Sequence, residues 1–152
     1  MSGIYNSFFS AMDISTTGLI TQRYRMNIAS ENLANIESTR TANGTTYRRK
    51  QVIMGAVGNN EQFIHMLMGA RVSMPMTGGA RILDVVEDPS PLRMVHKPGH
   101  PDADENGQVA MPNVNAILEM ADILSATRAY EANTTAFSAA KGMISKALDL
   151  AK

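Results

Sequence analysis

The stretch Ala29–Arg49, ASENLANIESTRTANGTTYRR, decides how the chain is organised, because a helical pattern ends inside it and a polar segment begins. Asn32 and Asn35 stand at the end of that pattern, and Asn43-Gly44 marks a turn further on. Asn tolerates left-handed backbone geometry and bonds its own backbone, so the two asparagines are expected to form a left-handed helix exit. The sequence predicts a helix before this point and a different structure after it.

The residues before the stretch follow the alternating spacing of four and three that is typical of a coiled-coil seam. Its apolar members are Phe8, Met12, Leu19, Met26 and Leu33. The second row of the seam is interrupted by Ser15 and Gln22, and Gly18 costs a helix interior about 1 kcal/mol relative to Ala. A long N-terminal helix is predicted, with a weakened seam.

A second and stronger seam follows Asn115, and the only Gly between Val114 and Lys152 is Gly142. Its apolar members are Met120, Ile123, Tyr130, Phe137, Ile144 and Leu148, with Thr127, Thr134 and Lys141 between them. Asn113 is expected to cap this helix. A neighbouring row of mostly small residues, including Ala126, Asn133 and Ala140, is expected to meet adjacent subunits.

The middle of the chain holds all six prolines. Strands are predicted at Tyr47–Met54 and Arg81–Glu87, and a further pair at Met94–Lys97 and Gln108–Met111 across the Asn106-Gly107 turn. The sequence predicts an α+β fold, mainly α, in which long N- and C-terminal helices form a coiled-coil-like pair beside a small β-rich middle domain. We expect a helical assembly core at 1–36 plus 113–152, and an outer domain at 37–112 with a poorly ordered stretch near 55–79.

Composition excludes several classes of function. Lys and Arg total 14, as do Asp and Glu, so the net charge of zero argues against a nucleic-acid binder. Cysteine is absent, which excludes disulfides and thiol chemistry. The chain starts without a secretory signal pattern, and no apolar run reaches the roughly 20 residues that span a bilayer. The 12 methionines suit either adaptable contact surfaces or ordinary core filling.

Few residues suggest chemistry. Asp102–Gly107, DADENG, resembles the start of a calcium loop, but the twelfth position is Asn113 rather than Glu, and prolines exclude the entering helix. His100 with Asp102 and Asp104 could hold a metal or serve a small enzyme, although a surface loop is the better interpretation. The basic cluster Arg48–Lys50 could bind phosphate, but a charged strand edge is favoured. We therefore expect no catalytic residue, metal or cofactor.

Four segments carry a family resemblance: NLAN at Asn32–Asn35, PGHPDADENG at Pro98–Gly107, MPNVN at Met111–Asn115 and SATRAYEAN at Ser125–Asn133. Together they resemble the bacterial flagellar basal-body rod proteins, and most closely the proximal-rod members. The resemblance implies a structural subunit without enzyme activity. It also implies export through the flagellar type III apparatus without a cleaved signal peptide, and assembly in the periplasm.

We therefore interpret the chain as a structural subunit of the proximal rod, which assembles through its terminal helices into a helical tube that transmits torque from motor to hook. Its expected partners are copies of itself, other rod subunits and the export apparatus, without nucleic acid or membrane insertion. The predicted assembly interface comprises Phe8, Met12, Leu19, Met26, Leu33, Asn32, Asn35, Met120, Ile123, Tyr130, Phe137, Ile144 and Leu148. The alternative is a soluble helical adaptor that binds one helix of a partner. Polar interruptions of the seams are expected to keep the termini of the free chain marginally stable.

Overall fold

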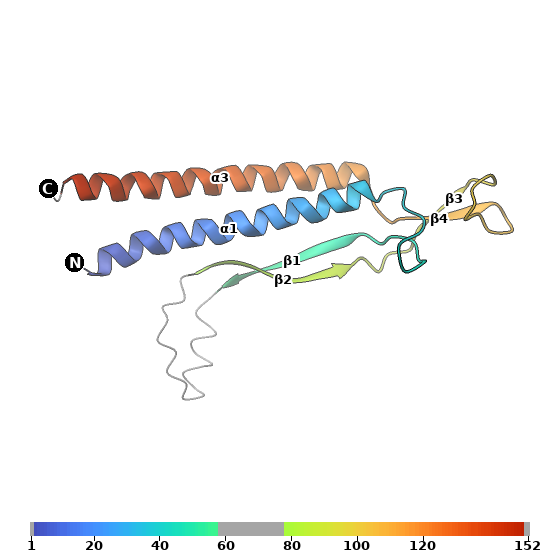
Figure 1. Ribbon diagram of the computed structural model, residues 1–152, viewed down its shortest axis with the longest axis horizontal. Coiled ribbons are helices and arrows are strands. Elements are labelled where there is room, and N and C mark those ends of the chain that lie inside the picture. Colours follow the sequence, from blue (N-terminus) through green and yellow to red (C-terminus); the bar gives the residue numbers. More distant parts are fainter. Residues whose placement is uncertain (1, 58–77, 151–152) are drawn as a thin grey trace, which may run out of the picture. The chain divides into compact units, whose positions relative to one another are not determined.

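The computed structural model describes residues 2–57 and 78–150, with side chains described from Phe9 onward except that of Val57. Its elements are α1 (Ser2–Ala34), β1 (Lys50–Val57), β2 (Gly79–Glu87), β3 (Arg93–His96), β4 (Gln108–Met111) and α3 (Ala116–Asp149). Figure 1 shows the two long helices side by side, with the strands supplied by the middle of the chain. The predicted fold class, two terminal helices packed together with a small β-rich middle, is confirmed.

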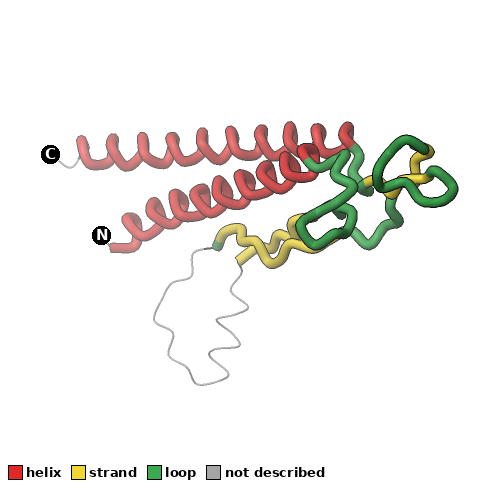
Figure 2. Tube along the Cα trace, turned by 45° about the vertical axis from the view of Figure 1, so that its right-hand side comes forward, coloured by secondary structure: helices red, strands yellow, loops and turns green. Residues whose placement is uncertain are grey.

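The strands form two separate two-stranded sheets, β1–β2 and β3–β4 (Figure 2). The predicted pairing across Asn106-Gly107 is confirmed, because β3 and β4 are antiparallel with Arg93 opposite Met111 and His96 opposite Gln108. Gly107 has a φ of 70°, the left-handed geometry that glycine adopts without strain. The prediction for 55–79 concerns mainly 58–77, which lie outside the described residues; its edges belong to β1 and β2.

The chain divides into two compact units. One comprises Met1–Arg23, Met54–Leu83 and Thr127–Lys152, and the other comprises Tyr24–Ile53 and Asp84–Ala126. Each unit therefore contains a segment of α1, a segment of α3 and parts of the strands, so the helix pair contributes to both.

In the first unit the helices approach closely at Gly18. A Cβ atom at this position would lie 2.7 Å from Oδ1 of Asn133 on α3, closer than such contacts occur in proteins. Glycine is therefore used here for helix packing, and the absence of its side chain outweighs its low helix propensity. Strand β2 also joins α1, because the backbone N–H of Ala80 donates to the Thr17 hydroxyl at 3.2 Å and the Thr21 hydroxyl donates to the Ala80 carbonyl at 3.4 Å.

In the second unit the core gathers around β4 and the start of α3, where Val109, Met111 and Val114 are buried. Ile28 and Ala29 of α1 complete it. The alternation along β4 explains this, because side chains i and i+2 of a strand face the same side. Burying such apolar side chains stabilises the fold by roughly 1.5–3 kcal/mol for each large one.

The start of α3 differs from the prediction. The cap is Asn115, whose Oδ1 accepts hydrogen bonds from the backbone N–H groups of Ile117 at 3.0 Å and Leu118 at 3.4 Å. The expectation that Asn113 caps the helix is wrong, because its side chain is engaged elsewhere: Oδ1 accepts from the backbone N–H of Arg49 at 2.8 Å. Both residues are good caps in isolation, and the tertiary contact decides between them.

Candidate assembly surfaces

The NLAN segment does not form a left-handed helix exit. Among the described residues only Gly44 and Gly107 have positive φ, so the left-handed prediction for Asn32 and Asn35 is wrong. Asn32 lies inside α1, which continues to Ala34. Asn35 ends the helix in right-handed geometry, with its side-chain Nδ2 donating to the Glu31 carbonyl at 2.9 Å. The same carbonyl also accepts from the backbone N–H of Asn35 at 3.1 Å, so backbone and side chain of Asn35 together close the last turn of α1.

Asn32 is the centre of a buried polar cluster, which we call the asparagine hub. Its exposed fraction is 1%, and both atoms of its amide are used twice. Nδ2 donates to the backbone carbonyl of Lys50 at 2.8 Å and to Oε2 of Glu119 at 2.9 Å. Oδ1 accepts from the backbone N–H of Lys50 at 2.9 Å and from the Tyr47 hydroxyl at 3.0 Å. The amide thereby satisfies both backbone groups of the first residue of β1, as a neighbouring strand would.

The carboxylate of the hub is paired. Glu119 on α3 is also 1% exposed, and its Oε1 accepts a hydrogen bond from Nε of Arg49 at 2.5 Å. Nη1 of Arg49 lies 3.7 Å from Oδ2 of Asp88. A buried charge is tolerated when it is paired and hydrogen-bonded. The hub therefore joins the end of α1, the beginning of α3 and the start of β1.

Two pKa values reflect this environment. Burial, aided by the negative charges of Glu31, Glu119 and Glu87, raises the pKa of Tyr47 to about 12. Hydrogen bonds from the side chain and backbone of Ser90, and then the Arg49 guanidinium, lower the pKa of Asp88. Burial in the hub thus favours the neutral phenol of Tyr47, and the hydrogen bonds from Ser90 favour the charged carboxylate of Asp88.

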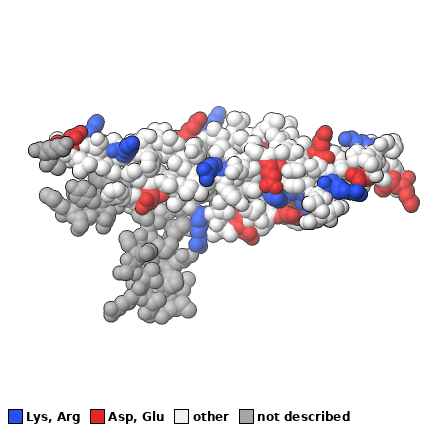
Figure 3. Space-filling view, viewed as in Figure 1, with Lys and Arg blue, Asp and Glu red and all other residues white. Residues whose placement is uncertain are grey.

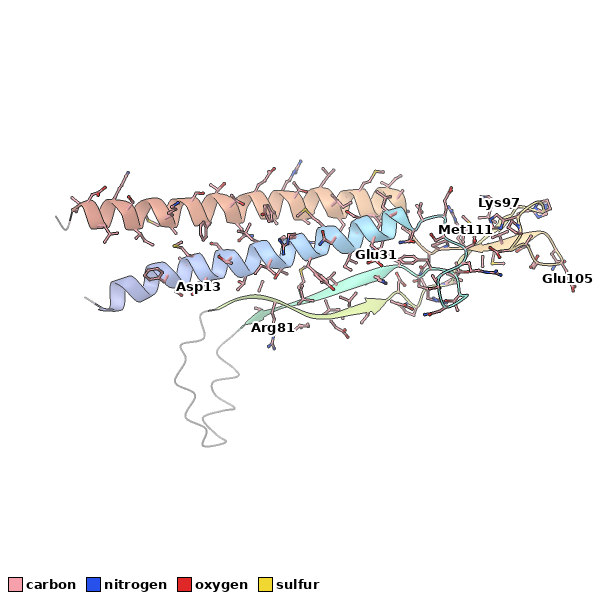
Figure 4. The ribbon with its side chains drawn as sticks, in the orientation of Figure 1. Asp13, Glu31, Arg81, Lys97, Glu105 and Met111 are labelled. Carbon is pink, nitrogen blue, oxygen red and sulfur yellow. The ribbon has the colours of Figure 1, made fainter. Side chains whose placement is uncertain are left out.

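The basic cluster Arg48–Lys50 is occupied by acceptors of the same chain. Nη1 of Arg48 donates to the carbonyls of Asp88 and Ser90 at 3.2 and 3.1 Å. Nζ of Lys50 lies 2.6 Å from Oε1 of Glu31, which Figure 4 labels near the end of α1. The phosphate-binding interpretation therefore has no support, and the cluster has a structural role.

The Asp102–Gly107 loop is a tight turn held by its own backbone. Oδ1 of Asp104 accepts from the N–H groups of Asn106 at 2.9 Å and Gln108 at 2.8 Å. Asp102 accepts from the Thr39 hydroxyl at 2.8 Å. Within 2–57 and 78–150, no group of three or more His, Asp or Glu side chains is arranged to hold a metal.

An open cavity of about 590 Å³ lies in the second unit between the end of α1 and the segment that follows it. Its lining is mostly polar and includes Asn35, Thr41, Thr45, Tyr47 and Lys50. Of its charged lining residues, Glu31 and Lys50 are paired with each other and Arg40 is paired with Asp102. Arg48 donates to backbone carbonyls, so most of these charges are engaged in holding the fold together.

The predicted interface residues fall into groups. Met12, Leu19, Met26, Leu33, Ile123, Tyr130, Phe137 and Ile144 are half-buried within the chain, while Met120 and Leu148 are each 51% exposed. Phe8 belongs to α1, but its side chain is outside the described residues. Whether these residues contact other subunits stays a prediction.

The small-residue row of α3 is used within the chain. Ala126 and Ala140 are buried, and Asn133 faces Gly18, so the expectation that this row is kept for adjacent subunits is wrong for these residues. Small side chains let α1 approach closely, and the polar Thr134 and Lys141 remain outside. Positions that the pattern assigned to an outer face therefore complete the seam.

Large apolar side chains remain exposed on both helices. Ile117 is 77% exposed, Leu124 is 62% exposed and Phe9 is 58% exposed. Figure 3 shows acidic and basic groups of both signs scattered over the visible face, with uncharged surface between them. Isolated exposed apolar residues are normal, but several on one helix face indicate a contact surface. None of the helices in the described part of the chain is long and apolar enough to cross a membrane.

Known proteins match the chain over nearly its whole length. Residues 105–150 match the model of the C-terminal region of the flagellar basal body rod FlgEFG proteins. The flagellar basal-body rod protein FlgC of Bacillus subtilis is 40% identical over 149 residues, which cover 95% of this chain and 98% of that protein. The FlgC proteins of Borreliella burgdorferi (38% identical, covering 92% of this chain and 95% of that one) and Escherichia coli O6:H1 (36% identical, 95% and 98%) are similar.

The chain belongs to the FlgC family. It is a structural protein of the flagellar basal-body rod and not an enzyme. Membership in the FlgC family confirms the resemblance of the four sequence segments to rod proteins, and it removes the support for an enzyme built on the His100–Asp104 loop. A rod protein of the FlgC type acts through the surfaces that contact other subunits. The asparagine hub therefore has a structural role: it holds the two helices and β1 together.

Proposed function

We propose that this chain is a subunit of the proximal rod and that its terminal helices join neighbouring subunits into a helical tube, which transmits torque from motor to hook. Its partners are copies of itself and other rod subunits. The observation that carries the proposal is the exposure of large apolar side chains, such as Ile117 and Leu124, on helices that already pack against each other. Such a surface is costly for a free chain and is suited to contacts with other subunits.

In this proposal 1–36 and 113–152 form the helical assembly core, and 37–112 form an outer domain. The half-exposed Met120 and Leu148 contact neighbours, while Ile123 and Phe137 hold the helix pair together within the chain. Asn32 contributes indirectly, because it fixes the end of the helix pair whose outer face is used.

Export through the flagellar type III apparatus and assembly in the periplasm complete the proposal. Several side chains on the helices bond back to their own backbone, for example the Ser15 hydroxyl to the Ala11 carbonyl at 2.9 Å and the Thr134 hydroxyl to the Tyr130 carbonyl at 3.0 Å. Oε1 of Gln22 is buried and has no hydrogen-bond partner among the described residues. These features weaken the helix pair, which supports easy unfolding before export.

The test uses the bacterium that encodes the chain. Deleting the gene is expected to abolish swimming, and an epitope-tagged copy is expected to restore it and to copurify with basal bodies. Cells that swim normally without the gene would overturn the proposal. So would a tagged chain found only in a soluble complex of fixed stoichiometry, which is the outcome that the adaptor alternative predicts.

A further inference from the structure

The first turns of α3 carry a wholly uncharged outer face. Ile117, Ala121 and Leu124 are exposed and follow the spacing of one helix face, with Met120 beside them. The two carboxylates of this segment point away from it: Glu119 is bonded to Arg49 and Asn32, and Asp122 is paired with Arg25. Because both carboxylates are engaged on the inner side of α3, the outer side carries only an apolar stripe of Ile117, Ala121 and Leu124.

The stripe ends at a cation. Arg128 follows Leu124 by one turn on the same face and is exposed. Within the part of the chain that the structure describes, Arg128 has no ion-pair partner. A partner for this face therefore needs apolar side chains and one carboxylate, placed about a helix turn apart.

The outer face of α1 has this composition. Phe9, Asp13, Thr16 and Ile20 are all exposed and follow the same spacing of four, three and four residues. Asp13, labelled in Figure 4, is the only charged residue between Ser2 and Gln22. Its carboxylate has no ion pair to any residue that the structure describes. Phe9 and Ile20 are 58% and 53% exposed, so this face of α1 is open to a partner.

We propose that the face Ile117–Ala121–Leu124–Arg128 binds the face Phe9–Asp13–Thr16–Ile20 of a second copy, with the helices antiparallel and Asp13 paired with Arg128. This inference rests on the proposed function and names the contact that it uses. Facing positions in this antiparallel register have numbers that add up to 141, as 13 and 128 do, so Ile20 lies opposite Ala121, between Leu124 and Ile117. Phe9 lies opposite Ala132, one turn beyond Arg128, and Ile117 lies opposite Tyr24, which is 39% exposed. A parallel register would place Ile20 beside the polar Thr135 and Ile117 beside Ser2.

The contact joins two different surfaces, so each copy keeps one of them free after binding. Such heterologous contacts continue from copy to copy and build rings or helical filaments. The net charge of zero means that identical copies do not repel each other over distance. The stripe is small beside the roughly 800 Å² per partner that a stable pair buries, so a free chain is expected to remain monomeric until many copies are gathered.

The test is a charge exchange in the strain that lacks the gene. Asp13→Arg and Arg128→Asp each place like charges in contact, and each is expected to lower the amount of chain in purified basal bodies by at least about tenfold. The double variant Asp13→Arg/Arg128→Asp restores the opposite charges and is expected to return incorporation and swimming toward the level of the wild type. Glu105→Arg, an exposed charge reversal on the turn between β3 and β4, is the matched control and is expected to assemble normally.

Each outcome decides the matter. Single variants that assemble like the wild type, or a double variant that assembles no better than the singles, overturn the proposed contact while leaving the proposed function intact. Failure of the wild-type gene itself to restore swimming overturns the proposed function instead. Circular dichroism of the purified variants separates assembly from folding. Asp13 and Arg128 are exposed and unpaired among the described residues, so all four variants are expected to melt like the wild type.

Discussion

Replacing Asn32 with Ala removes the centre of the asparagine hub, and the structure sets the size of the effect. Four hydrogen bonds are lost, two from Nδ2 and two to Oδ1. At about 1 kcal/mol for each bond the expected loss in the free energy of unfolding is about 4 kcal/mol. The substitution leaves the Glu119–Arg49 ion pair in place, but it removes one hydrogen bond from the buried Glu119 carboxylate, and a buried polar group left without a partner costs about 1–3 kcal/mol.

Asn35→Ala is the matched control, since it changes the same residue type in the same NLAN segment. Asn35 bonds only to Glu31 and Ser38 near the surface, where water can replace both contacts. The expected loss is about 1 kcal/mol or less. The larger effect at Asn32 corresponds to a decrease in Tm of roughly 8–16 °C for a chain of this size.

Urea unfolding followed by circular dichroism measures both losses, and m-values show whether the two variants unfold in the same way. The reasoning would be refuted if Asn32→Ala and Asn35→Ala lost the same free energy of unfolding. Asn32→Asp is a second test. It keeps the shape of the side chain but removes the Nδ2 donor and places a second carboxylate beside that of Glu119. It is expected to be at least as unstable as Asn32→Ala.

Four further results are expected. Because the pKa of Tyr47 is raised to about 12, its contribution to stability is complete below pH 10 and is lost as the pH rises from 10 through 12, and Tyr47→Phe should flatten that part of the stability curve measured by urea unfolding. Gly142→Ala meets no atom within 4 Å and should stabilise the chain by about 1 kcal/mol, whereas Gly18→Ala collides with Asn133 and should stabilise it less or destabilise it; equal gains in urea unfolding would contradict this packing. Phe137→Asp puts a charge in the seam and should lower the helix content seen by circular dichroism, and a normal spectrum would show that the seam is dispensable. In the free chain the amides of both terminal helices should exchange with deuterium faster than those of the β3–β4 hairpin, and equal protection would argue against marginal termini.

Local patterns were sufficient for the elements of the fold. The alternating spacing identified both long helices because each must turn an apolar row toward the other, and this requirement acts along a single helix. The hairpin of β3 and β4 was predicted because Asn106-Gly107 is a local turn signal. The predicted start of β1 at Tyr47 is three residues early, because the backbone N–H of Tyr47 donates to the Ser38 carbonyl and that of Arg49 donates to the Asn113 side chain, and neither pairs with a strand.

The hub itself could not be predicted from local patterns. The local pattern predicts Asn32 as part of a left-handed helix exit, whereas its partners Lys50 and Glu119 lie 18 and 87 residues further along the chain. One signal was available: Glu119 stands 14 residues before Asn133, and Gly18 stands 14 residues before Asn32. Once Gly18 is matched with Asn133 in an antiparallel pair, the repeat of seven brings Asn32 to Glu119.

The sequence pattern also misplaces the second row of the α3 seam, which it assigns to Met120, Thr127, Thr134, Lys141 and Leu148. Ala126 and Ala140 carry little hydrophobic area, so an apolar pattern ranks them below Met120 and Leu148. In the folded chain the small residues are buried because they allow close helix approach, and the larger ones are left outside. Side-chain volume, and not hydrophobicity alone, decides which row faces the partner helix.

The central claim is that the outer apolar faces of the terminal helices are covered by neighbouring subunits in the rod. Leu124→Cys tests it most directly, because the chain contains no other cysteine and a maleimide label then reports on one position. The thiol is expected to react rapidly in the free chain, to be protected in purified basal bodies, and to react again after urea dissociates them. A thiol that reacts as fast in intact basal bodies as in the free chain would contradict the claim.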